Sequence, residues 1–125
     1  MAKDYKVEIT EISNPNLSKI QRVMLKTDPG QKLDDFNNLV LEEITGYAKL
    51  HVTNPSVKAT PEYDHFVVMT SAGNFYTGSP SFMEAFLSIW SEMEGETGWG
   101  LEVYKRDSKN FAGKQFLTCR LVELK

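Results

Sequence analysis

The stretch that decides the fold is residues 79–94, SPSFMEAFLSIWSEME. Its large apolar residues recur at the spacing of one helix face, and they are Phe82, Phe86, Ile89, Trp90 and Met93. Ser79 can cap the first turn, Pro80 suits the first helical position, and Gly95 is a helix stop. Because a stripe with two Phe and one Trp needs an apolar surface to cover, we expect this helix to pack on the core.

Upstream of this helix the patterns are mixed. Residues 5–12 alternate between apolar and polar side chains and predict a strand. After a turn at residues 14–16, residues 17–27 contain one possible helical turn, but their β-branched content favours a second strand. Residues 31–41 mix acidic and apolar side chains and are interpreted as a short helix or an irregular connection.

Around the helix, clear strand patterns occur at residues 44–53, 63–70, 75–77, 99–106 and 115–124. Three strands, a helix and two strands is the order of an OB-fold, a small Greek-key barrel with a helix at one end. The sequence therefore predicts a mainly β protein with one helix, an OB-like Greek-key barrel with extra N-terminal strands. The alternative is an α+β layer, with one helix on an open antiparallel sheet.

Composition places the chain in a broad class. We interpret residues 1–125 as a single domain, long enough to form a core without metal or disulfides. The lone Cys119 can form no internal disulfide, which favours a reducing, cytoplasmic compartment. No apolar run approaches the ~18 residues of a membrane span, and the N-terminus MAKDYK does not resemble a signal peptide, so we expect no membrane association.

Charge is unevenly distributed along the chain, although the net charge is only −3. Residues 79–98 carry four glutamates and no lysine or arginine. Residues 99–125 carry six basic residues against three acidic ones. We therefore expect an anionic partner to bind the C-terminal region.

Nothing in the sequence has the pattern of an active site. His51 and His65 lack a second cysteine for a metal site, and Gly113-Lys114 lacks the first glycine and the Ser or Thr of a phosphate loop. Adjacent acidic residues such as Asp34-Asp35 point apart in a strand and do not converge on one atom. We predict that the protein is not an enzyme and needs no cofactor.

A binding surface is better supported. Strand alternation places aromatic and basic side chains on the face opposite the core-forming residues, beside a basic hairpin tip at residues 107–114. Rings stack on bases and cations neutralise phosphates, so we predict a single-stranded nucleic-acid site with little sequence preference. The competing interpretation is a solvated sheet face whose rings pack on neighbouring strands. The candidate residues are Tyr47, Lys49, Tyr104, Lys105, Arg106, Lys109, Phe111, Lys114, Phe116 and Arg120.

Two segments resemble the small single-stranded-DNA-binding proteins of phages and mobile elements of Gram-positive bacteria. They are residues 62–86, where Thr77-Gly78-Ser79 precedes Ser81-Phe82, and residues 108–122. The resemblance implies an OB-fold that binds single-stranded DNA in phage replication or recombination and that self-associates. The chain ends LVELK, without the acidic tail of cellular homologues, which puts partner recruitment through such a tail in doubt.

Two expectations about partners follow. An exposed strand edge can pair with its copy, and two domains gain avidity along one DNA strand, so we predict a homodimer in the host cell cytoplasm. Phage recombination or replication proteins are further expected partners. The alternative function is a phage-encoded protein-interaction module that binds a host or phage protein through a strand edge or the acidic helix.

Overall fold

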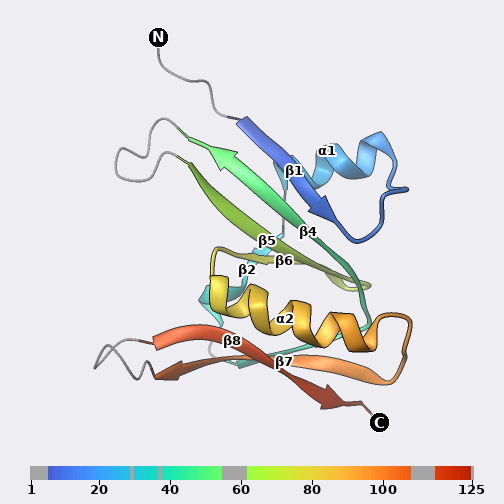
Figure 1. Cartoon of the computed structure of the whole chain (residues 1–125), viewed down its shortest axis with the longest axis vertical. Coiled ribbons are helices and arrows are strands. Elements are labelled where there is room, and N and C mark those ends of the chain that lie inside the picture. Colours follow the sequence, from blue (N-terminus) through green and yellow to red (C-terminus); the bar gives the residue numbers. More distant parts are fainter. Residues whose placement is uncertain (1–5, 29, 37, 55–61, 108–114, 125) are drawn as a thin grey trace.

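The chain is mainly β-structure with two α-helices (Figure 1). The computed structural model describes residues 6–28, 30–36, 38–54, 62–107 and 115–124. The elements in chain order are β1 Lys6–Ile12, α1 Lys19–Thr27, β2 Gln31–Lys32, the 3-10 turn η1 Leu33–Asp35, β3 Asn38–Glu42, β4 Ile44–Thr53, β5 Glu62–Thr70, β6 Gly73–Thr77, α2 Pro80–Met93, β7 Trp99–Asp107 and β8 Gln115–Glu123. The five strands predicted from residue 44 onward are confirmed.

The strands form two sheets. The first sheet has the order β1-β4-β5-β6-β2 and the second the order β3-β7-β8. Only Glu43 separates β3 from β4, and its φ of 52° turns the chain from the second sheet into the first. The Ser71 amide and hydroxyl both donate to Glu43, at its carbonyl and its carboxylate, and so hold this unusual backbone conformation.

The described parts of the two sheets do not close into a barrel. The edge of β6 that would have to meet β8 pairs instead with β2, in parallel, through Gln31 and Lys32. A side-chain contact there links the start of α2 to the second sheet, because the Ser79 hydroxyl donates to the Leu117 carbonyl at 3.1 Å. The architecture is a β-rich α+β fold, and the closed OB barrel predicted from the element order is not confirmed.

Helix α2 was predicted correctly, and it lies between β4 and β5 on one side and β7 and β8 on the other (Figure 1). The Ser79 hydroxyl accepts from the Phe82 amide at 3.2 Å, and Pro80 occupies the first turn. Phe82 and Phe86 have no exposed surface. The aromatic stripe therefore fills the space between the two sheets.

Helix α1 corrects the prediction of a strand over residues 17–27. The Ser18 hydroxyl accepts from the Gln21 amide at 3.1 Å, and the Gln21 side chain accepts from the Ser18 amide at 2.9 Å. This capping box satisfies two amides that no helical carbonyl can reach. The capping signal Ser-x-x-Gln that begins at Ser18 outweighs the β-branched content of this segment.

Two cores share the first sheet. The larger core lies between the two sheets and contains α2; its buried residues are Leu33, Leu41, Phe66, Val68, Phe82, Phe86, Trp99, Leu101, Val103, Leu117 and Cys119. The smaller core lies under α1 and consists of Leu25, Ala48, Leu50 and Val67. The first sheet thus packs on both faces, although α1 covers only part of one, and the outer face of the second sheet has no layer of described residues over it.

Candidate nucleic-acid interface

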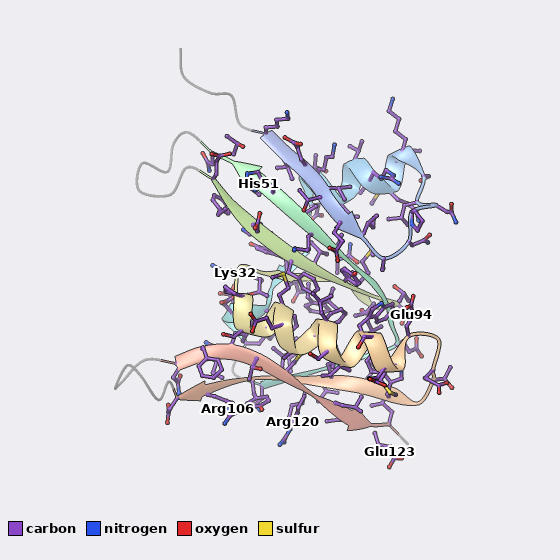
Figure 2. All side chains as sticks on the ribbon, in the orientation of Figure 1. Lys32, His51, Glu94, Arg106, Arg120 and Glu123 are labelled. Carbon is purple, nitrogen blue, oxygen red and sulfur yellow. The ribbon has the colours of Figure 1, made fainter. Side chains whose placement is uncertain are left out.

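The outer face of the second sheet brings together four of the predicted binding residues. The strand register pairs Arg106 with Phe116 and Tyr104 with Thr118, and Arg120 lies opposite Glu102. On β7 these side chains alternate with buried ones, whereas on β8 Thr118 is buried like its neighbours Leu117 and Cys119. Figure 2 shows Arg106 and Arg120 on the side away from α2. We call this surface the Tyr104 face; it comprises Asn38, Val40, Glu102, Tyr104, Arg106, Phe116, Thr118 and Arg120.

Electrostatics differ between the two arginines of this face. Arg120 forms an ion pair with Glu102, and its guanidinium carbon lies 5.4 Å from the centre of the Tyr104 ring. That cation–π contact holds the ring beside the ion pair. Arg106 is exposed and makes no hydrogen bond or ion pair with any other described residue. Arg106 can therefore contact a phosphate directly, whereas Arg120 must share its charge with Glu102.

Lys105 does not belong to this face. It lies opposite Leu117, on the inner side of the sheet, and its Nζ donates to the Asp34 carbonyl at 3.0 Å. Because neighbours along a strand point to opposite faces, Tyr104 and Lys105 cannot both line one surface. The prediction that Lys105 lies at the groove rim is wrong, and the lysine instead ties η1 to β7.

Tyr47 corrects a second prediction. Its side chain points to the other face of the sheet from Ala48 and Leu50, as predicted, but α2 covers that face. The Tyr47 ring stacks on Phe66, with centroids 5.4 Å apart, and meets Phe86 edge-on at 5.8 Å. Its hydroxyl donates to Glu11 at 2.7 Å. Burial, followed by this hydrogen bond, raises the pKa of Tyr47 to about 12. Tyr47 is thus a partly buried residue that packs against the larger core.

Lys49 lies on the same face of β4, beside a 170 Å³ pocket at the start of α2. That pocket belongs to the first sheet, so Lys49 and Tyr47 are not continuous with the Tyr104 face. The predicted single groove is therefore divided between two sheets. The other predicted rim residues, Lys109, Phe111 and Lys114, lie outside the described residues.

A second aromatic row was missed by the sequence analysis. The Tyr63 and His65 rings are 5.1 Å apart and the His65 and Tyr76 rings 4.9 Å apart, on the face of the first sheet that carries α1. Lys32 pairs with Tyr76 in the β2–β6 ladder and extends the row, and Figure 2 labels it. Burial, followed by the charge of Lys32, lowers the pKa of His65. We call these four residues the Tyr63 row; the alternation of Tyr63 and His65 was the available signal.

One end of the first sheet is acidic. His51 Nδ1 lies 2.8 Å from Asp64 and Nε2 lies 3.2 Å from Glu62. The hydrogen bonds to Asp64 and then Glu62 raise the pKa of His51. Among the described residues, no group of three or more His, Cys, Asp or Glu side chains could hold a metal ion. Two carboxylates beside the imidazole make this end unfavourable for a phosphate chain.

Comparison with known proteins adds no relative. No family model matches the chain, and no curated protein or solved structure is significantly similar to it. In the part of the chain that the structure describes, neither helix has the length and apolar character needed to cross a membrane. The geometry of the Tyr104 face and of the Tyr63 row is therefore the basis for a functional proposal.

Proposed function

We propose that the protein binds single-stranded DNA with little sequence preference and organises it during phage replication or recombination. The observation that carries the proposal is the gathering of Tyr104, Arg106, Phe116 and Arg120 on one sheet face over which no other described element packs. A ring can stack on any base at ~1–3 kcal/mol, and guanidinium groups neutralise phosphates. Neither contact depends on the nucleotide sequence of the DNA. The proposal assigns the protein to the host cell cytoplasm, with no catalytic activity and no cofactor.

An opened OB-like barrel is part of this proposal. In the first sheet neighbouring strands follow the order β6-β5-β4, and in the second sheet the order β3-β7-β8. The turn at Glu43 joins β4 of the first order to β3 of the second, and α2 connects β6 to β7. The same succession of strands and helix occurs in an OB-fold, with β2 taking the place of the closing ladder. OB-folds bind oligonucleotides on the face of their second and third strands, which here would be β5 and β6. The three aromatic rings of the Tyr63 row lie on those strands, so the row supports a second contact region.

Self-association through β1 accompanies this proposal. β1 is an edge strand of the first sheet, and an edge can pair with a second copy to give the predicted homodimer. Two copies on one DNA strand would gain avidity. Recruitment of phage replication or recombination proteins belongs to the same proposal.

Protein binding is a second candidate function. It is favoured by the net charge of −3, which opposes a purely electrostatic attraction to DNA, and by three exposed apolar residues on α1. In that case the Tyr104 face would be an ordinary solvated sheet surface. The two functions make different predictions about an oligonucleotide.

The test is fluorescence anisotropy with labelled oligonucleotides of several sequences at low and moderate salt. We expect similar affinities for all sequences, weaker at the higher salt, because phosphate contacts release counterions. Arg106→Ala should reduce the salt slope by about one phosphate contact, whereas the matched control Lys26→Ala, on exposed α1, should leave it unchanged. No binding of the wild-type protein at low salt would exclude DNA and leave protein binding.

A further inference from the structure

Helix α1 exposes the apolar side of an amphipathic helix. Leu25 is its only buried residue, whereas Ile20 is 73% exposed, Met24 60% and Val23 47%. Because residues three and four apart are neighbours on a helix, these three side chains form one continuous stripe. An uncovered apolar stripe on an otherwise polar surface marks an interaction site. We call Ile20, Val23 and Met24 the α1 stripe.

The stripe has a basic border. Lys19 and Lys26 are exposed, and α1 contains no acidic residue. Neither lysine side chain forms a hydrogen bond or an ion pair with another described residue. The third base, Arg22, is instead occupied within the chain, since it donates to the carbonyls of Pro15 and Leu17. A partner for α1 should therefore combine an apolar surface with carboxylates that can face Lys19 and Lys26.

A groove with those properties lies between the β3–β4 turn and the α2–β7 turn. It has a volume of about 550 Å³, and Glu42, Glu43 and Glu96 supply its carboxylates. Ile44, Trp99 and Leu124 supply its apolar lining. The Glu43 carboxylate accepts from Ser71, but the side chains of Glu42 and Glu96 pair with no other described residue. We call this the acidic groove.

We propose that the α1 stripe of one copy docks in the acidic groove of a second copy. Ile20, Val23 and Met24 would cover the apolar lining, while Lys19 and Lys26 meet Glu42 and Glu96. Charge complementarity of this kind selects one partner and one orientation. The observation that favours a second copy over a foreign protein is that both halves of the interface are present on the same chain.

The two surfaces determine the form of the assembly. Along the long axis, vertical in Figure 1, α1 lies in the upper half and the α2–β7 turn in the lower half. A chain cannot then fill its own groove. Because the two halves of the interface are different surfaces, contact is head-to-tail, and each added copy presents a new free groove. This differs from the closed dimer that pairing of two β1 edges would give.

Complementation between two variants, each lacking one half of the interface, tests the proposal by sedimentation velocity. Nucleic acid is absent, so the result is independent of DNA binding, and any pairing of β1 edges is common to all variants. Ile20→Ser/Met24→Ser removes the stripe, and Glu42→Lys/Glu96→Lys reverses the groove. The average mass of the wild-type protein should increase as its concentration rises from low to several hundred micromolar. The stripe-to-groove association of each variant alone should be weaker by about tenfold or more. An equimolar mixture should form one stripe-to-groove contact between the two variants and so exceed the mass of either variant alone, because it contains one intact stripe and one intact groove.

Matched controls separate the loss of the interface from a general effect of charge. Glu84→Lys/Glu92→Lys makes the same charge change on the exposed side of α2 and should associate like the wild type. All substituted side chains are exposed to solvent, so circular dichroism should confirm unchanged folding. A wild-type chain that stays monomeric, or a mixture of folded variants that does not associate, would overturn the proposal.

Discussion

Tyr104 and Tyr47 show at the scale of single residues how one side-chain type takes two roles. Tyr104 lies on a sheet face that no element of the described chain covers, with the Arg120 guanidinium over its ring. Tyr47 is partly buried and packs on Phe66 and Phe86 at the edge of the larger core. The first ring is accessible to a base, whereas the second is enclosed by α2. Substitution of each should therefore affect a different property of the protein.

Tyr104→Ala should weaken oligonucleotide binding by ~1–3 kcal/mol with a nearly unchanged salt slope, because a stacked ring carries no charge. Tyr47→Ala should instead destabilise the fold by about 3 kcal/mol, since it removes a large core side chain. Anisotropy titrations and urea unfolding of both variants measure the two effects. A stable Tyr104→Ala protein with wild-type affinity would show that the DNA site lies elsewhere, with the Tyr63 row as the next candidate.

The two histidines should titrate on opposite sides of their ordinary pKa of about 6.5. The raised pKa of His51 contributes stability below pH ~6.5, which is lost as the pH rises through the raised value. The lowered pKa of His65 contributes stability above pH ~6.5, which is lost as the pH falls through the lowered value. NMR titration of the imidazole protons should resolve both midpoints, and Asp64→Asn should lower that of His51. Coincident midpoints would contradict the two environments.

At the scale of the element, both helices have a serine N-cap, but the two serines form different hydrogen bonds. Ser18 caps α1 within a capping box, at an exposed position. Ser79 caps α2 and also donates to the Leu117 carbonyl of β8. One serine therefore stabilises a single helix end, and the other also links α2 to the second sheet.

Ser18→Ala should cost about 1 kcal/mol of unfolding free energy and Ser79→Ala about 2 kcal/mol. The difference arises because only the second change removes a bond between two elements. Urea unfolding of both variants, with Ser88→Ala in the exposed middle of α2 as the control, measures it. Equal losses at Ser18 and Ser79 would mean that the link to Leu117 adds nothing.

At the scale of the whole molecule, the first sheet couples the two cores. Val67 packs under α1 in the smaller core, while its neighbours Phe66 and Val68 face the larger one. Because strand neighbours point to opposite faces, neither core can lose its sheet without exposing the other. Trp90 and Trp99 both belong to the larger core, so tryptophan fluorescence reports on that core alone.

We expect a single cooperative unfolding transition, with fluorescence and far-ultraviolet circular dichroism giving the same midpoint. Leu25→Ala, in the smaller core, should destabilise the protein by ~2–5 kcal/mol and should move the fluorescence midpoint as well. The control Met24→Ala, on the exposed side of the same helix, should change stability little. A Leu25→Ala protein whose fluorescence midpoint stays unchanged would show that the cores unfold separately.

Sequence alone determined the features that depend on neighbours along the chain. The period of Phe82, Phe86 and Trp90, with the cap at Ser79, predicted α2 because helix periodicity and capping are local properties. Alternation predicted which side chains of β7 and β8 share a face for the same reason.

Only the tertiary structure decided which face is covered and which residues meet across elements. Alternation separates Tyr47 from Ala48, but it cannot reveal that α2 covers one side and α1 the other. The Tyr63 row needs β2, β5 and β6 side by side, and β2 on the edge of β6 leaves the barrel open. Such contacts join residues distant in sequence, and the packing of whole layers rather than any local pattern selects them.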